Sequence, residues 1–381
     1  MVIVIKILLL AFMLSCQHSK PVHTLENGIV INLDVPDNTT FKASDIFKGV
    51  QPIILETKPE SLIARISELQ VFEDYLFVLD RIGRSLIAFS REGKFIRRIG
   101  GLGRGSGEFS TIEDFTVDPV NRLIYIMDRH IVHKYTIDGV YINSLRINVN
   151  NETILRAIQY FDGYFYFTVA HPKENDSLLI QIDPVTGGIV NKYLNLADRK
   201  YWNGTPFEPV FFNRLHGIPK YTSLFMESVV SLDDISKCII FESKNFPTTA
   251  MIDNIKKQIP HLQLFAITEM NKITGINSFL ETTDFIFIAY NFGNRLITSV
   301  FCKKENQLHN VLNFNNLVFE AGVPFKIRCA DNNGVFEIME VEQLLLCLEY
   351  GVLLIENQKE REPLLAINED SNPIIFYYEF K

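Results

Sequence analysis

The chain has 381 residues, of which 47% are hydrophobic and 12% aromatic, and its 30 Phe and 14 Tyr favour a large core built from strands. A formal net charge of −8, without any run of basic residues, excludes a protein that grips the phosphate backbone of nucleic acid. Its single Trp excludes a cage of several Trp for sugars or cations.

The first 16 residues, MVIVIKILLLAFMLSC, predict an export signal over 1–15. The apolar run holds one Lys and no acid, and it is shorter than the roughly 20 apolar residues that a spanning helix needs. Its end resembles a bacterial lipobox, in which the cysteine, here Cys16, is lipidated and becomes the new N-terminus. Met13 departs from the usual Leu, so an ordinary signal peptide or a short N-terminal anchor is the alternative.

The segments 75–100 and 123–145 repeat the same order of features. Each has an apolar strand, an Asp-Arg pair, a second strand and a hairpin turn centred on Gly93 or Gly139. The segment 164–194 is a weaker third copy. Nearly every residue of the first strand is apolar, as expected for a strand packed between two neighbouring sheets.

Three later segments, 237–243, 285–301 and 335–350, are each predicted to supply the equivalent strand of another unit. The strands then begin near 75, 123, 164, 238, 285 and 335, with one long interval that predicts an insertion near 197–225. Four-stranded units of this length without helices between them are typical of propeller blades. We therefore predict an all-β fold, a six-bladed β-propeller of four-stranded antiparallel blades.

This propeller is expected to form a single domain over 27–381, after a linker over 16–26. A β-sandwich or two β domains is the alternative. The stretch 249–262 fits the pattern poorly and is interpreted as a short amphipathic helix or an irregular excursion in the fourth blade.

The glycine-rich run GGLGRGSGEF (100–109) invites a phosphate-binding interpretation, which its spacing does not support. The third glycine of GxGxxG is missing, no GK[ST] follows, and the next residues form a strand pattern rather than a helix. The run is predicted to connect the first blade to the second, with glycines supplying positive φ.

No catalytic set and no metal site is predicted. His130 and His133 would point to opposite faces of a strand and could not share a metal. Asp80 and Asp128 end equivalent strands and are the candidates for the axial channel, although an aspartate that caps a turn through backbone amides is the alternative. The acids Asp233, Asp234, Glu281 and Asp284 lie in turn-like stretches and are interpreted as solvated connections.

The insertion near 197–225 interrupts the repeat and is rich in aromatic residues. Long loops in compact folds are often binding elements, so it supplies the candidate ligand-binding residues. These are Tyr201, Trp202, Phe207, Phe211 and Phe212. Alternatively the insertion folds back as a lid or packs against a blade edge.

Four cysteines follow Cys16, at Cys238, Cys302, Cys329 and Cys347, with spacings that match no zinc knuckle. Each lies in an apolar segment, which favours buried free thiols, and disulfides remain open because an exported protein could pair them.

The sequence resembles the six-bladed β-propeller lipoproteins common in Bacteroides-type bacteria, which are relatives of NHL-repeat propellers. The resemblance is carried by PIILETKPESLI (52–63), GKFIRRIGGLGRGSGEF (93–109), DFTVDPVNRLIYIMD (114–128) and NEDSNPIIFYYEFK (368–381). Ser106 stands where the family usually has proline. The resemblance implies a propeller fold and an envelope address, but little activity, because fold alone does not give function.

These observations predict a lipid-anchored, monomeric, non-enzymatic binding or scaffolding protein of the cell envelope, whose partner is a protein or a glycan. The residues after Cys16 carry no acidic pair, which favours the periplasmic side of the outer membrane. No cofactor is predicted. The alternative is a metal-assisted propeller hydrolase or lyase for a sugar or lactone, with calcium as one possible ion. A propeller with a purely structural role is a third option.

Overall fold

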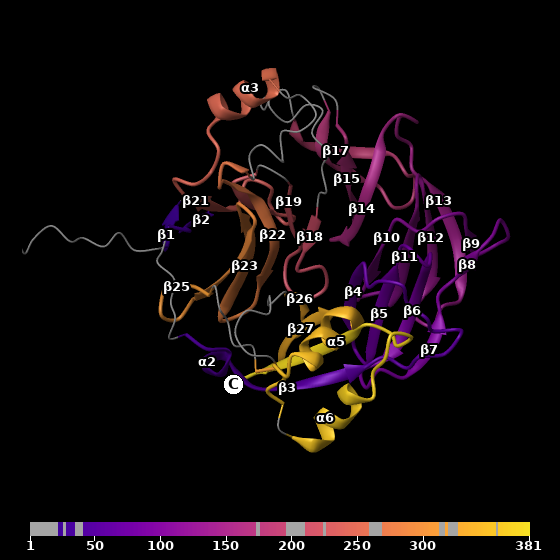
Figure 1. Ribbon diagram of the computed structural model, residues 1–381. Helices are drawn as coiled ribbons and strands as arrows, with labels where there is room; N and C mark the ends of the chain where they lie inside the picture. Colours follow the sequence, from indigo (N-terminus) through magenta and orange to yellow (C-terminus); the bar gives the residue numbers. More distant parts are fainter. Residues whose placement is uncertain are drawn as a thin grey trace, which may run out of the picture.

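The computed structural model describes residues 22–25, 28–34, 41–172, 176–195, 210–223, 226–258, 269–311, 317–318, 327–355 and 357–381. The export signal predicted over residues 1–15, Cys16, Tyr201, Trp202 and Phe207 lie outside these ranges. The described strands form six large sheets arranged around a common centre (Figure 1), which confirms the six-bladed β-propeller.

The first three blades follow the chain without interruption, each with four antiparallel strands in chain order. Blade one comprises β4 (Glu68–Phe72), β5 (Tyr75–Asp80), β6 (Ser85–Ser90) and β7 (Phe95–Arg98). Blade two comprises β10 (Asp114–Asp118), β11 (Leu123–Asp128), β12 (Ile131–Thr136) and β13 (Tyr141–Arg146). Blade three comprises β14 (Ile154–Phe161), β15 (Tyr164–Ala170), β16 (Ser177–Ile182) and β17 (Ile189–Asn195).

The glycine-rich run lies between blades one and two, as predicted. It forms two short parallel strands, β8 (Gly101–Leu102) and β9 (Glu108–Phe109). Gly100, Gly103 and Gly107 all have positive φ, the conformation that glycine adopts without strain.

The last three blades are less regular. Blade four contains β18 (Val210–Phe212), β19 (Lys220–Thr222), β20 (Ser228–Ser231) and β21 (Cys238–Glu242). Blade five contains β22 (Ile273–Glu281), β23 (Phe285–Phe292), β24 (Arg295–Cys302) and β25 (Gln307–Asn310). Blade six contains β26 (Ile327–Ala330), β27 (Gly334–Met339), β28 (Ile374–Phe380) and β3 (Phe47–Ile54).

The N-terminal part of the described chain joins two different blades. β3 pairs antiparallel with the C-terminal strand β28 and so closes the ring in blade six. Ahead of it, β1 (Val22–Leu25) and β2 (Gly28–Asn32) extend blade four to six strands, with β2 parallel to β21. This extension departs from the uniform four-stranded blades that the sequence predicts, because the repeat pattern carries no information about which strand the N-terminus will join.

The hydrophobic core lies between blades. In β5, Leu76, Phe77, Val78 and Leu79 are fully buried. Phe77 and Leu79 belong to the cluster shared with blade two, whereas Leu76 and Val78 belong to the cluster shared with blade six. Side chains alternate between the two faces of a strand, so this apolar run packs against both neighbouring blades at once.

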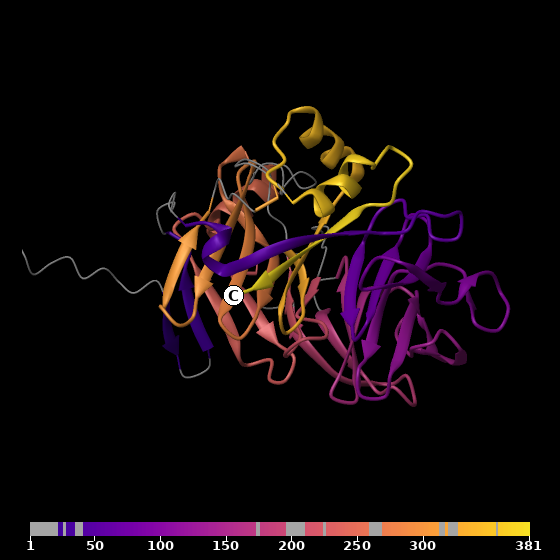
Figure 2. The ribbon, with the colours of Figure 1, turned by 90° about the horizontal axis from the view of Figure 1, so that it is seen from below.

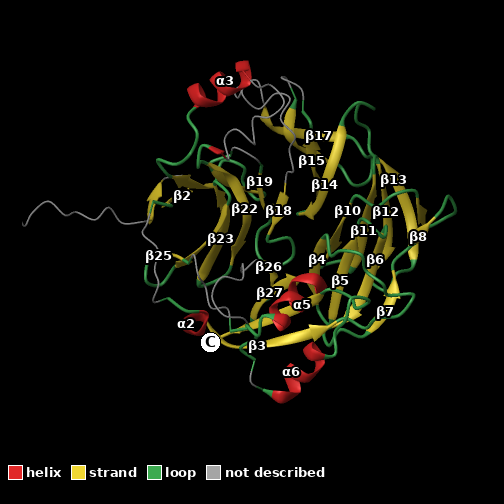
Figure 3. Cartoon of the chain, in the orientation of Figure 1, coloured by secondary structure: helices red, strands yellow, loops and turns green. Residues whose placement is uncertain are grey.

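Four helices lie at the edge of the described ring (Figure 3). They are α2 (Ala43–Ile46), α3 (Thr249–Gln258), α5 (Val341–Glu349) and α6 (Gln358–Leu365). α5 and α6 stand together beside blade six, between β27 and β28 in the chain (Figure 2). Among the described residues, no helix is long and apolar enough to cross a membrane.

Two strand predictions need correction. The segment at 237–243 supplies β21, the fourth strand of blade four, and the second strand is instead the short β19. Residues 341–349, predicted to continue a strand, form α5, in which Val341, Leu344 and Cys347 recur at helical spacing on its buried side. The helical interpretation of 249–262 is confirmed over the described part by α3.

Candidate binding site at the mouth of a plugged channel

The side chain of Arg214 bonds to residues on the innermost strands of three other blades at the centre of the ring. Arg214 follows β18, and its two terminal nitrogens each lie 3.1 Å from an oxygen of Asp114 on β10. The same guanidinium lies 3.1 Å from Oε1 of Glu68 on β4 and donates to the backbone carbonyl of Ile158 on β14. Bidentate, charge-assisted pairs of this kind are short and geometrically specific. Arg214 thereby connects four blades.

The Arg214–Asp114 pair is almost completely withdrawn from water, whereas the Glu68 side chain is 23% exposed. The Asp114 side chain is fully buried and that of Arg214 is 8% exposed. Burial by itself lowers the pKa of Arg214, but Asp114 and Glu68 outweigh it and the net pKa is raised. Burial raises the pKa of Glu68, while Arg214 opposes that shift. Because the charges are compensated and the donors are occupied, the cluster closes the channel rather than offering it to a ligand.

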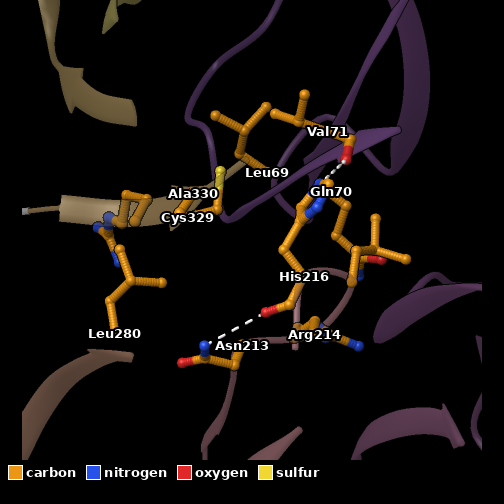
Figure 4. Close-up of a pocket in the computed structure, with 11 residues that line it drawn as sticks. Leu69, Gln70, Val71, Asn213, Arg214, His216, Leu280, Cys329 and Ala330 are labelled. Carbon is orange, nitrogen blue, oxygen red and sulfur yellow. Dashed lines mark hydrogen bonds between the residues drawn. The ribbon is translucent and has the colours of Figure 1, made fainter. Parts of the chain in front are cut away.

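The loop that carries Arg214 lies across the channel as a plug. Asn213 exchanges hydrogen bonds with the backbone of Glu281 on β22: its amide nitrogen donates to the carbonyl at 2.5 Å, and its Oδ1 accepts from the N–H at 2.9 Å. On the other side, Nε2 of His216 lies 3.1 Å from the Val71 carbonyl oxygen on β4 (Figure 4). The remaining cavity beside these residues holds about 20 Å³, room for about one water molecule. We call residues 213–217, together with the Arg214 partners Glu68 and Asp114, the plug.

A much larger cavity of about 750 Å³ opens outside the plug. Its wall is formed by the β22–β23, β24–β25 and β26–β27 hairpins, the start of β3, the end of β28, part of the plug and the start of β19. The lining residues that carry the argument below are Lys220, Glu281, Thr283, Phe285, Lys303, Asp331, Asn332, Asn333 and Phe380.

Most charges in this wall are paired within the protein. Glu281 lies between two lysines, with Oε1 at 3.0 Å from Nζ of Lys303 and Oε2 at 3.5 Å from Nζ of Lys220. Asp331 accepts from Arg91 at 2.6 Å. The wall is therefore polar, with little uncompensated charge at these positions.

Neutral polar groups and an aromatic pair complete the wall. Thr283, Asn332 and Asn333 are exposed, and none of their side chains is hydrogen-bonded to another described residue. The half-buried rings of Phe285 and Phe380 stack with centroids 5.8 Å apart and an interplanar angle of 25°. This arrangement offers amide and hydroxyl groups beside an apolar surface.

The two aspartates that the sequence assigns to the channel serve a different purpose. Oδ2 of Asp80 accepts from the Ala64 N–H at 2.6 Å, and its Oδ1 accepts from the Gly83 N–H at 2.9 Å. Asp128 accepts from both the N–H and the hydroxyl of Ser110. Each ends the second strand of its blade, whereas the hairpins between first and second strands border the cavity. Both aspartates cap turns, the alternative that the sequence left open.

The aromatic insertion is shorter than expected. Phe211 and Phe212 belong to β18 and are only 4% and 8% exposed, packing against Tyr221 and Phe279 respectively. Both rings are core residues in this structure, because they alternate onto the two faces of an innermost strand, and a ligand role for them stays a prediction. His130 and His133, which the sequence places on opposite faces of a strand, have separate partners. The His130 ring is hydrogen-bonded to the Thr153 carbonyl and the His133 ring to the Ser144 hydroxyl.

The four cysteines beyond Cys16 are free. Cys302 and Cys347 are buried, whereas Cys238 and Cys329 are half-buried. The expectation of buried thiols therefore holds for two of the four.

The residues that build the plug and the cavity were not nominated from the sequence. Arg214 and Asp114 are 100 residues apart and meet only because blades two and four face the same centre. One signal was available: Asn213, Arg214 and His216 interrupt an otherwise apolar stretch between short strands. Glu281, taken for a solvated connection, is the anion that holds two wall lysines.

Comparison with known proteins agrees with this fold. A protein from Bacteroides fragilis that is described as exported matches 93% of this chain and 99% of its own length, with 17% identity and a TM-score of 0.74. A Bacteroides vulgatus protein of the DUF4221 family matches 88% of this chain and 97% of its own, with 11% identity and a TM-score of 0.53. No curated protein matches the sequence. The family described as a domain of unknown function (DUF4934) matches residues 28–379, so the chain belongs to that family.

Proposed function

We propose that this protein is a lipid-anchored binding module of the cell envelope that takes a glycan into the cavity outside the plug. The observation that carries the proposal is the contrast inside that cavity between paired charges and free neutral groups. Glu281 pairs with both Lys220 and Lys303, which leaves one net positive charge there, whereas the exposed Asn332 and Asn333 amides have no hydrogen-bond partner among the described residues.

A glycan matches this chemistry better than a charged ligand. Its hydroxyls exchange hydrogen bonds with amide and hydroxyl side chains, and the C–H face of a sugar ring packs against an aromatic surface such as Phe285. A cavity of this size accommodates a short saccharide, because ligand sites commonly measure about 300–1,000 Å³. A charged ligand would have to displace the existing ion pairs.

The envelope address rests on the export signal and Cys16. The Bacteroides fragilis relative described as exported supports it at the level of the fold. Two or more acyl chains hold a protein durably on a bilayer. Metabolic labelling with a fatty-acid analogue should label the wild-type chain and leave Cys16→Ala unlabelled. Equal labelling of both would refute the anchor.

The binding proposal is tested by screening the purified chain against an array of neutral bacterial and host glycans. The leading hit is then titrated against two variants of the wall, Asn332→Ala and Phe285→Leu. Each removes about 1 kcal/mol of contact, so the affinity should fall about fivefold per variant.

Asn143→Ala is the matched control, because Asn143 is exposed on β13 in blade two, away from the cavity wall. It should bind like the wild type. The glycan proposal would be contradicted if no glycan bound and the wild type instead captured a protein that Asn332→Ala does not bind. The ligand of the cavity would then be a protein. Shortening of the bound saccharide during the assay would favour a hydrolase instead.

A further inference from the structure

The β24–β25 hairpin of blade five brings together a thiol, an imidazole and a carboxylate. Cys302 is the last residue of β24, Glu305 lies in the turn, and His309 lies on β25. One ligand atom of each lies within 4.8 Å of the others, and this is the one such group among the described residues.

Strand register explains why two of these side chains share a face. His309 is directly opposite Val300, and Val300 lies two residues before Cys302 on the same strand. Residues opposite each other in an antiparallel pair point to the same face, as do residues two apart along a strand. The fold therefore places the thiol and the imidazole together.

The two inner residues are held in place and the third is accessible. Cys302 and His309 are 7% and 6% exposed, whereas Glu305 is exposed to solvent. The Phe41 ring stacks on the His309 ring with centroids 4.2 Å apart and planes within 9°, which fixes the orientation of the imidazole. A cation from solvent would meet Glu305 first and then the buried pair.

The surrounding charge favours a cation. Glu305 and Asp45 of α2 both act electrostatically on Cys302 and on His309. Among the described residues, no basic side chain forms an ion pair with either carboxylate, and the neighbouring Lys303 is turned to Glu281. Oδ2 of Asp45 accepts from the Lys42 N–H, so Asp45 contributes charge and Glu305 is the carboxylate free to bind.

The protonation states without a metal are those of a neutral pair. Burial, with Glu305 and Asp45 adding to it, raises the pKa of Cys302 to about 11, so the thiol keeps its proton near neutral pH. Burial lowers the pKa of His309, so its imidazole is neutral near neutral pH. A bound divalent cation reverses the first effect and releases the thiol proton to solvent.

We propose that Cys302, Glu305 and His309 form a binding site for a divalent transition metal, with Zn²⁺ as the ion whose preferences they match. Thiolate and imidazole select zinc over calcium or magnesium, which prefer sets made wholly of oxygen ligands. Zn–S and Zn–N bonds of about 2.3 and 2.0 Å bring ligand atoms to roughly 3.5 Å from one another. Metal binding therefore requires the observed spread of up to 4.8 Å to contract by about 1 Å.

Three protein ligands leave a fourth position for water. The same hairpin also supplies Lys303 to the wall of the proposed binding cavity, although none of the three ligands lines that cavity. The metal site stands independently of the glycan proposal, because it rests on a different group of residues.

The test uses the full-length chain purified with its anchor in detergent and stripped of metal. Titration with Zn²⁺ alone is followed by calorimetry, and titration with Co²⁺ alone by near-ultraviolet absorption, where a thiolate bound to cobalt gives a charge-transfer band. The wild type should take up one equivalent of either ion and develop the band.

Cys302→Ser should abolish the band and weaken zinc binding by about tenfold or more. Cys347→Ser is the matched control, because Cys347 is a second buried thiol that lies on α5 instead of the hairpin. It should keep both the band and the affinity.

Glu305→Gln changes an exposed side chain without disturbing the core, so it tests the site even if Cys302→Ser does not fold. It should keep the band while zinc affinity falls about tenfold. Failure of the wild type to bind zinc, persistence of the band in Cys302→Ser, or unchanged affinity in Glu305→Gln would each overturn the site.

Discussion

The plug and the cavity wall lie next to each other and use the same kinds of side chain, yet they differ in what those side chains can still do. In the plug, Arg214 and Asp114 satisfy each other almost entirely away from water, and the partly exposed Glu68 completes the group. In the wall, the ion pairs around Glu281 are partly exposed, and the amides beyond them have no partner among the described residues. The concentration of charge would favour the plug as the ligand-binding site. Exposure and unsatisfied hydrogen-bonding groups favour the wall instead.

The difference follows from the position of each group along the axis. Innermost strands converge at the centre of a propeller, so polar groups there, such as Asp114, meet partners from several blades. Hairpins such as the one at Thr282–Asp284 project beyond the sheet and retain free groups. The comparison leads to a graded set of stability effects, largest in the plug and smallest in the wall.

The largest effect is expected for Arg214→Ala. Removal of the guanidinium leaves the fully buried Asp114 with only the more distant Arg81, at 3.9 Å, and takes away the ion-pair partner of Glu68, which should lower the free energy of unfolding by about 3 kcal/mol. Urea unfolding measures it. Arg97→Ala is the control, because the Arg97–Asp138 pair is largely exposed and should contribute less than about 1 kcal/mol. If the two variants lowered the free energy of unfolding equally, the plug pair would be no more stabilising than a surface ion pair.

Asn213 tests how the plug is attached to blade five. Its φ of +52° lies in the left-handed region, and its side chain satisfies both backbone groups of Glu281. Asn213→Gly removes only the hydrogen bonds and should cost about 2 kcal/mol in the free energy of unfolding. Asn213→Ala adds about 1 kcal/mol, because alanine tolerates positive φ less well than glycine. If the alanine variant is no less stable than the glycine variant in urea unfolding, the backbone strain plays no part.

The regular half of the ring could be predicted from the sequence because its signals are local. The second strands at Tyr75, Leu123 and Tyr164 begin where the repeat places them. Blade four could not be predicted in the same way, because β18 and β19 have three residues each and show too little alternation to detect. Ring closure by β3, and the addition of β1 and β2 to blade four, depend on pairing between distant segments.

The candidate sites were beyond the reach of sequence patterns for the same reason. The plug joins Glu68, Asp114 and Arg214 from three blades, and no spacing rule links them. The cluster at Cys302, Glu305 and His309 is local, but it becomes recognisable only once the register of β24 and β25 is known.

Glu281 lies at the boundary between the two regions, and its side chain belongs to the wall. Glu281→Gln keeps the shape but removes the charge that holds Lys220 and Lys303, so the free energy of unfolding should fall by about 1 kcal/mol at low salt. The loss should shrink as salt screens the pairs, which urea unfolding at two ionic strengths would detect. Glu379→Gln is the control, since the Lys48–Glu379 pair is more exposed and should matter less. If Glu281→Gln lowered the free energy of unfolding as much as Arg214→Ala, Glu281 would have the structural role of a plug residue.

The smallest effect is expected at Asn332, where the comparison is sharpest. Its side chain is exposed and bonded to no described residue, so Asn332→Ala should change the free energy of unfolding by less than about 0.5 kcal/mol. The same variant should weaken glycan binding about fivefold, because the lost hydrogen bond is made only to the ligand. Unfolding curves and glycan titrations on one preparation separate the two quantities. A loss of stability above about 1 kcal/mol would make Asn332 part of the framework, and the wall would then differ from the plug in degree only.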